Sequence, residues 1–143
     1  IDEHEEEAFE AAVTEALEEP LPRHDYRGMA DLRRRARVRI AGGEGNRDFN
    51  EHLECLHHAS LDVYQADVVW STGILRARQL AQAVQATGAL FSPHTWGDGL
   101  GLLANLHVAG CVGRALYRVS LRPARVDAGA ARLHPAGNDR GRS

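Results

Sequence analysis

Residues 61–94 read LDVYQADVVWSTGILRARQLAQAVQATGALFSPH and contain a complete strand–helix–strand pattern. The apolar run over 61–69 predicts a strand. Over 73–87 apolar residues recur at the spacing of one helix face, namely at Ile74, Ala77, Leu80, Ala81 and Val84. Gly88 is expected to end this helix, and a second strand is expected over 89–94. A helix joining two strands in this way predicts a β/α unit.

The same pattern recurs toward the N-terminus. VRIAGGE at 38–44 predicts a strand followed by a helix near 48–59. ALEEP at 16–20 is a weaker strand pattern and precedes a helix expected near 26–37. Consecutive β/α units predict an α/β fold with a parallel sheet, which here would form part of a (β/α) barrel.

Composition describes one globular unit without the charge that nucleic-acid binding needs. The 143 residues are 43% hydrophobic and carry a formal net charge of -3, which excludes a strongly basic surface. No apolar run approaches the ~18 residues of a membrane span, and the acidic N-terminus differs from a signal peptide. Cys55 and Cys111 stand far apart, so we expect reduced thiols in a cytoplasmic protein. Because the chain begins with Ile1, we expect a fragment or a processed product.

Four chemically reactive side chains stand where the expected strands end. They are separated by 26, 23 and 27 residues, about one β/α unit each, and are Glu18, Glu44, Asp67 and His94. In a parallel (β/α) barrel the carboxyl ends of the strands converge on one mouth, where the active sites of such barrels lie. The spacing therefore predicts that these four side chains surround one ligand.

The chemistry of the four residues fits a metal-assisted proton transfer. Glu18 and Glu44, on neighbouring strands, would supply the hard oxygens that Mg²⁺ prefers. A carboxylate beside an imidazole fixes its tautomer and stabilises its protonated form, so Asp67 would let His94 take or return a proton. We therefore expect two metal ligands and one catalytic Asp–His pair.

Four segments resemble the successive strand-end motifs of one enzyme family. They are LEEPLPRHDY, RIAGGE, QADVVWSTGI and FSPHTWGDGLGLLANLHVA, and in this order they resemble the mandelate racemase and muconate lactonizing enzyme family of the enolase superfamily. The resemblance runs over about 17–112. It implies that Glu18 and Glu44 are the second and third Mg²⁺ ligands. Asp67 and His94 then resemble the Asp–His dyad of the mandelate racemase subgroup.

The resemblance also implies a reaction and a substrate class. Members of the family abstract the proton α to a carboxylate, and the enediolate is then reprotonated or loses a β-hydroxyl group. This implies a dehydratase or racemase that acts on a hydroxy acid or sugar acid, and HTWGDGLGLLANLH is closer to the acid-sugar dehydratases. The parent enzyme is expected to be a homo-oligomer without nucleic-acid or membrane partners. Three further residues are expected at the same mouth: His24, Asn46 and Trp96. We interpret them first as rim residues, and contact with the substrate is the second interpretation.

The chain also departs from the family's pattern. Family enzymes carry an α+β capping domain and a modified (β/α)₇β barrel, whereas residues 17–112 resemble only the C-terminal half of the barrel. Residues 1–16 are expected to form an acidic helix that matches no family segment. Residues 113–143 are rich in Arg, Ala and Gly, and shifting synonymous codons for 113–133 by one nucleotide gives a family-like terminus. We therefore infer a frameshift near 110–113, and a non-catalytic remnant stays open as a second hypothesis.

Each candidate has a simpler structural alternative. Glu18 and Glu44 taken singly would be solvated loop carboxylates. Asp67 alone would be a loop cap, and His94 alone a hydrogen-bonded loop histidine. A further cluster suggests zinc but has no second ligand pair, so it is interpreted as a helix surface: His52, Cys55, His57 and His58. The arginines between positions 33 and 39 are interpreted as a solvated helix face.

Overall fold

The computed structural model describes residues 16–96 and 99–112. These residues form one parallel sheet with helices on one of its faces. The strands follow one another in the order β1-β2-β3-β4. They are short: β1 (Leu17–Glu18), β2 (Ile40–Gly42), β3 (Val63–Tyr64) and β4 (Leu90–Phe91). All three neighbouring pairs are parallel. The α/β fold with a parallel sheet, expected from the sequence as part of a barrel, is confirmed.

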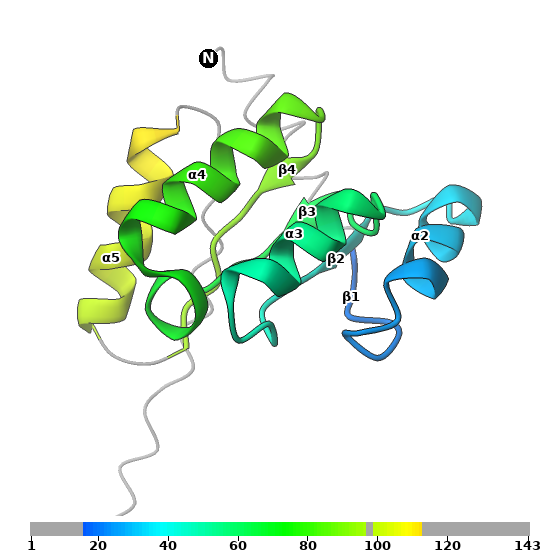
Figure 1. Cartoon of the computed structure of the whole chain (residues 1–143), viewed down its shortest axis with the longest axis horizontal. Coiled ribbons are helices and arrows are strands. Elements are labelled where there is room, and N and C mark those ends of the chain that lie inside the picture. Colours follow the sequence, from blue (N-terminus) through cyan, green and yellow to red (C-terminus); the bar gives the residue numbers. More distant parts are fainter. Residues whose placement is uncertain (1–15, 97–98, 113–143) are drawn as a thin grey trace, which may run out of the picture.

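Helices connect the strands and follow the last one. They are α2 (Tyr26–Arg35), α3 (Phe49–His57), α4 (Gly73–Ala86) and α5 (Gly99–Cys111), and a π-helical turn, η1 (Val68–Thr72), precedes α4. Figure 1 shows the helices in front of the sheet, in chain order from α2 at the right to α5 at the left. This arrangement follows from the parallel pairing, because each connection must return the chain to the same end of the sheet.

Local signals place the helix ends. The Asp25 carboxylate accepts a hydrogen bond from the Gly28 amide at 2.9 Å, and Asp48 accepts two from the first turn of α3 at 2.7 and 3.1 Å. Such caps satisfy amides that have no partner within the helix. Gly88 follows α4 with φ of +80°, a conformation that strains other residues. The expected end of this helix is therefore confirmed.

The main hydrophobic core lies between the sheet and the helices. Its largest members are at most 1% exposed and include Ile40, Tyr64, Phe91, Leu80 and Val84. Burying one such side chain contributes about 1.5–3 kcal/mol. A smaller cluster, formed by Ala41 and Val63 with Ala16 and Leu90 beside them, lies on the opposite face. The two clusters follow from the alternation of side chains along each strand.

Three expectations about these elements need correction. Residues 68–69, expected in a strand, form the start of η1 because the Asp67 side chain caps this turn. Ile74 is 55% exposed, since the buried face of α4 begins one turn later. Arg33, expected on a solvated face, donates a hydrogen bond from Nε to Asp62 Oδ1 at 2.5 Å and so ties α2 to the segment before β3.

The remaining expectations concern the two cysteines, membrane spans and the two ends of the chain. Cys55 is a buried free thiol and Cys111 an exposed one. None of the described helices is both long and apolar enough to cross a membrane. The proposals for an acidic helix over most of 1–16 and for a frameshifted tail over 113–143 lie outside the described residues.

Candidate functional site at the strand ends

The four expected side chains stand at the carboxyl ends of four neighbouring strands. Glu18 is the last residue of β1, and Glu44 comes two residues after β2. Asp67 and His94 each come three residues after their strands. The ladder continues past β4, because the His94 amide donates to the Ala66 carbonyl at 3.3 Å. The structure thus brings all four residues to one edge of the sheet.

Glu18 reaches across β2 to a residue that the sequence analysis missed. Gln65 Nε2 donates a hydrogen bond to Glu18 Oε1 at 2.8 Å, although 47 positions separate the two residues. Gln65 shares its face of β3 with Val63, the face opposite the helices. The only available sequence signal was the position of Gln65 two residues before Asp67.

Glu44 and His94 form a contact between their loops. His94 Nε2 lies 3.0 Å from Glu44 Oε2, and the two side chains are 18% and 21% exposed. Because an ionised carboxylate only accepts hydrogen bonds, Nε2 carries the hydrogen in this pair. His94 Nδ1 is buried and has no hydrogen-bond partner among the described residues. The indole ring of Trp96 lies beside the imidazole, with the ring centroids 5.5 Å apart.

Asp67 is 1% exposed, and its carboxylate is occupied by backbone amides. Oδ1 accepts hydrogen bonds from the amides of Val69 at 2.9 Å and Trp70 at 3.1 Å. Oδ2 accepts a third from the amide of Trp96 at 2.7 Å. Within the described part of the chain these amides take the place of the expected bond to His94. Asp67 therefore ties the loop after β3 to the loop after β4.

Asn105 joins the same two loops from α5. Its Oδ1 accepts a hydrogen bond from the Val68 amide at 3.0 Å, and its Nδ2 donates to Thr95 Oγ1 at 3.1 Å. Asn105 is fully buried on the face of α5 that also carries Gly101 and Val108. Asn105 was not expected from the sequence, although one polar residue at helical spacing within this face was a visible signal.

Glu19, the second carboxylate of the EEP segment, holds the loop that carries Glu44. Its Oε1 lies 3.2 Å from the Gly43 amide and 3.4 Å from the Gly45 amide, both donors. Arg23 donates a hydrogen bond to the Gly45 carbonyl of the same loop. From the sequence, only Glu18, the first carboxylate of the pair, was expected at the site, and Glu19 was missed.

Of the three residues expected at the rim, two lie at the surface and one does not. His24 is exposed and accepts a hydrogen bond from Arg23 Nε at 2.9 Å. Trp96 is 52% exposed. Asn46 is 1% exposed, with its Nδ2 3.3 Å from His52 Nδ1. Asn46 therefore lies behind the loop, packed against α3, and the expected rim position is wrong for this residue.

The interpretation of His52 and Cys55 as helix surface is also wrong. They are 0% and 4% exposed, because this side of α3 packs toward the loops of Asn46 and Ser71. His52 Nε2 lies 3.2 Å from Ser71 Oγ, which in turn donates to the backbone carbonyl of Asp67 at 2.9 Å. Burial lowers the pKa of His52 to about 4 and raises the pKa of Cys55 to about 11. Both side chains are therefore neutral at pH 7.

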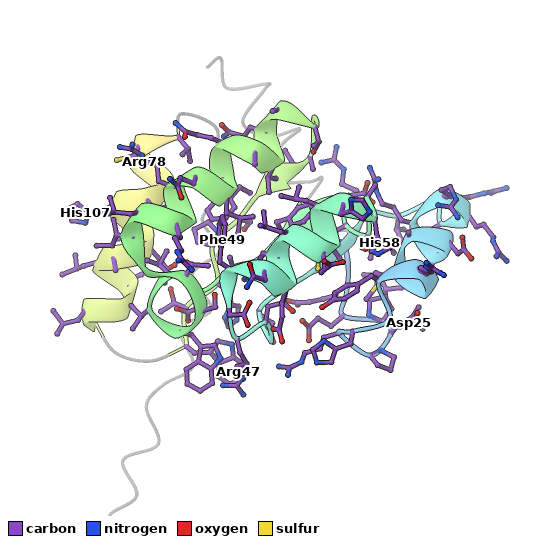
Figure 2. All side chains as sticks on the ribbon, in the orientation of Figure 1. Asp25, Arg47, Phe49, His58, Arg78 and His107 are labelled. Carbon is purple, nitrogen blue, oxygen red and sulfur yellow. The ribbon has the colours of Figure 1, made fainter. Side chains whose placement is uncertain are left out.

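A basic and aromatic pair lies at the rim. The guanidinium carbon of Arg47 stands 4.1 Å from the centroid of the Trp70 ring, which is a cation–π distance. Figure 2 shows Arg47 at the lower edge of the molecule, below α3. Neither residue was expected at the site from the sequence, since their contact joins the loop after β2 to η1.

The donor atoms at this edge suit Mg²⁺ in type. Glu18 and Glu44 offer carboxylate oxygens, the hard ligands that this cation takes. Within the described residues, no group of three or more His, Cys, Asp or Glu side chains could hold a metal ion. A cation held by these two carboxylates would therefore need water or further oxygens to complete its six positions.

Comparison with known proteins connects this arrangement to one family. Residues 6–136 match the family model described as enolase C-terminal domain-like. The chain is 31% identical over 107 residues to arabinonate dehydratase from Saccharolobus solfataricus. That alignment covers 74% of this chain and 28% of the relative, so the chain spans little more than a quarter of that enzyme's length.

Solved structures show the same likeness. A mandelate racemase/muconate lactonizing enzyme-like protein from Rubrobacter xylanophilus is 26% identical with a TM-score of 0.66, over 71% of this chain and 26% of that one. An enolase from Agrobacterium radiobacter, proposed to be a galactarate dehydratase and solved with Na and L-malate bound, is 27% identical with a TM-score of 0.65. That match covers 72% of this chain and 27% of the other.

Proposed function

The chain belongs to the family of enolase C-terminal domain-like proteins, and from this premise we propose that its strand ends form part of an acid-sugar dehydratase or racemase site. The resemblance to mandelate racemase and muconate lactonizing enzymes is confirmed by this membership. A relative named as an arabinonate dehydratase supports a sugar acid or hydroxy acid as substrate. Because the chain spans only part of that relative, the activity, a homo-oligomeric parent and a cytoplasmic location are all parts of the proposal.

The proposed reaction removes the proton α to the substrate carboxylate. A divalent cation such as Mg²⁺, held by Glu18 and Glu44, would withdraw electron density from the carboxylate and make that proton more acidic. His94 accepts the proton as the C–H bond breaks. In a dehydration the C–O bond to the β-hydroxyl group then breaks, and the proton leaves with the hydroxyl as water. In a racemisation water returns a proton to the α-carbon from the opposite face, and the proton on His94 passes to water.

The observation that carries the proposal is the hydrogen-bonding state of His94. Its Nε2 is directed at Glu44 at 3.0 Å, and its Nδ1 is buried without a partner in the described part of the chain. With the hydrogen on Nε2, the lone pair is on Nδ1, the atom that can accept a proton. Buried polar atoms are usually hydrogen-bonded, so an unpaired one beside a candidate metal ligand favours a functional role.

Asp67 acts in this proposal by holding the loops in place. Its three amide contacts fix the turn after β3 and the backbone just after His94. The Asp67–His94 dyad stays a prediction, because it requires the imidazole to turn away from Glu44 and toward Asp67. His24 and Trp96 remain proposed substrate contacts at the rim, whereas Asn46 supports the loop from behind.

A second candidate function is a non-catalytic chain that binds a cation weakly or not at all. It is favoured by the finding that the described residues hold no group of three metal-binding side chains. Proton abstraction from carbon requires a complete and well-positioned site. The two candidates therefore make opposite predictions for the purified chain.

Exchange of the α-proton in deuterated water separates the two candidates. The purified chain with Mg²⁺ would be incubated with arabinonate, galactarate and L-malate, and the C–H signal followed by proton NMR. Mg²⁺-dependent exchange that is lost in His94→Asn supports the enzyme, and His57→Asn, an exposed residue of α3, is the matched control. Exchange that persists in His94→Asn contradicts the role of His94, and no exchange with any acid supports the non-catalytic chain.

A further inference from the structure

We propose that Gln65 is a second positioning residue of this site. Its Nε2 orients Glu18, and its Oε1 accepts a hydrogen bond from an O–H group, either of a water bound to the cation or of the bound hydroxy acid. The inference rests on the function proposed above, because it assigns Gln65 to the same cation and substrate position. It adds a residue to the site and a selection for hydroxyl-bearing ligands.

The first support is the state of the two polar atoms of Gln65. Its Nε2 donates to Glu18 Oε1 at 2.8 Å, whereas its Oε1 is buried and has no hydrogen-bond partner among the described residues. Gln65 is 4% exposed, so bulk water does not solvate this oxygen freely. An unpaired amide oxygen in such a place is unfavourable unless something binds it.

The orientation of this amide is set by its neighbour. The oxygen and nitrogen of a Gln side chain are assigned from their hydrogen bonds. An ionised Glu18 can only accept, so the nitrogen must face it and the oxygen must point elsewhere. Rotating the amide by half a turn would place two oxygens against each other. Oε1 is therefore the atom of this amide that is left to bind a donor.

The second support is the position of Gln65 on the sheet. It lies between Val63 and Asp67 on the face opposite the helices, and the parallel pairing of β3 with β4 brings His94 to the neighbouring strand end. Three further buried side-chain atoms lack a partner among the described residues, and they lie in the segments that follow β2, β3 and β4: Asn46 Oδ1, Thr72 Oγ1 and His94 Nδ1. Of these, His94 Nδ1 belongs to the strand end next to that of Gln65, and the two unpaired atoms there indicate a polar ligand between the loops.

The chemistry of the oxygen restricts what it can bind. An amide oxygen accepts hydrogen bonds, so it selects a donor and gains nothing from a substrate carboxylate. Two groups bound at the proposed site can donate a hydrogen bond, namely the hydroxyl group of a hydroxy acid and a water held by the cation. Both present an O–H to Gln65.

The experiment measures Mn²⁺ binding to the purified chain by electron paramagnetic resonance, with Mn²⁺ in place of Mg²⁺. Gln65→Met keeps the length of the side chain and removes both hydrogen-bonding groups. Glu18→Gln removes a proposed ligand, and Gln82→Met, at an exposed position of α4, is the matched control. We expect Gln65→Met to weaken Mn²⁺ binding about 10-fold or more, as removal of groups that orient metal ligands does. The control should bind as the wild type does.

A pair of acids separates the two sources of the O–H group. L-malate and succinate are the same dicarboxylate with and without a hydroxyl group. If Gln65 receives the hydroxyl, L-malate should increase Mn²⁺ binding more than succinate in the wild type, and Gln65→Met should remove this difference. If Gln65 receives cation-bound water, the two acids should behave alike and Gln65→Met should weaken Mn²⁺ binding with either.

The outcomes for Gln65 and for the proposed function are distinct. Wild-type binding that Glu18→Gln weakens and Gln65→Met leaves unchanged overturns the role of Gln65 alone. Wild-type protein that binds no Mn²⁺ overturns the proposed cation site and the role of Gln65 with it. Circular dichroism checks that each variant folds. Should Gln65→Met unfold, the side-chain amide resonances of Gln65 in the wild type must shift during a Mg²⁺ titration, and unchanged resonances contradict the inference.

Discussion

The sheet of this protein joins two regions that are held together by different forces. On the face covered by helices, Tyr64 and Phe91 from the strands pack with Leu80 and Val84 of α4, and all are at most 1% exposed. At the strand ends, buried polar groups join the loops, and Asp67 alone accepts hydrogen bonds from three backbone amides.

This difference indicates a division between stability and positioning. Dispersion and burial in the helix-covered core are non-directional and grow with the apolar area removed from water. Hydrogen bonds at the strand ends are directional, so each one fixes the position of a loop. We therefore expect substitutions in the core to change stability most, and substitutions at the strand ends to change geometry more than stability.

The largest effect is expected in the helix-covered core. Leu80→Ala should lower the free energy of unfolding by about 2–5 kcal/mol, because it leaves a cavity at a fully buried position. Leu75→Ala is the matched control on the same helix, since Leu75 is 74% exposed and its loss should cost less than about 0.5 kcal/mol. Urea denaturation followed by circular dichroism measures both. Equal losses would show that α4 does not dock on the sheet as described.

The second effect concerns pH and the buried His52. Burial lowers its pKa from 6.5 to about 4, so the unfolded chain binds a proton more readily than the folded one. Stability from this group is complete above pH 6.5 and decreases as the pH falls toward 4, by roughly 3 kcal/mol in total. His52→Gln should remove this part of the pH dependence, whereas His57→Gln on the exposed side of α3 should retain it. Unfolding curves between pH 4 and 7 test this, and an unchanged slope in His52→Gln contradicts it.

A smaller effect is expected at Asp67. In Asp67→Asn one oxygen can still accept from η1, but the new NH₂ group meets the Trp96 amide, donor against donor. We expect a loss of roughly 1–3 kcal/mol. Hydrogen exchange should become faster at the Trp96 amide and stay slow at the Leu90 amide, which donates to the Asp62 carbonyl at 2.9 Å. Unchanged exchange at Trp96 would mean that Asp67 does not hold the loop after His94.

The smallest effect is expected at the rim. Arg47→Ala removes the guanidinium that lies 4.1 Å from the Trp70 ring centroid, and contacts of this kind at exposed sites contribute about 0.5–1 kcal/mol. Tryptophan fluorescence should change while the unfolding midpoint changes little. Arg78→Ala, an exposed arginine of α4, is the control and should leave the fluorescence as it is. A loss above about 2 kcal/mol would place Arg47 in the structural core of the loops.

The fold could be predicted well from the sequence because its determinants are local. Helical spacing over 73–87 and the glycine that follows placed α4 almost correctly, and the order of the units implied parallel strands. The same reasoning failed for 68–69, where apolar residues suggested a strand. There the side chain of Asp67 caps a turn, and a side-chain contact of this kind overrides the apolar pattern.

The candidate site could be predicted only in part. That Glu18, Glu44, Asp67 and His94 stand at strand ends follows from one β/α unit between each pair, so chain order determined it. Chain order does not determine which of these side chains contact one another. In the structure His94 pairs with Glu44, and Gln65 pairs with Glu18.

The sequence by itself determined the succession of β/α units, the end of α4 at Gly88 and the edge of the sheet that carries the reactive residues, because periodicity and chain order suffice for these. Only the tertiary structure decided that His52 is buried and that His94 faces Glu44 while amides occupy Asp67. These pairings join residues from different β/α units. They depend on how loops and helices pack against one another, and no pattern along one segment contains that information.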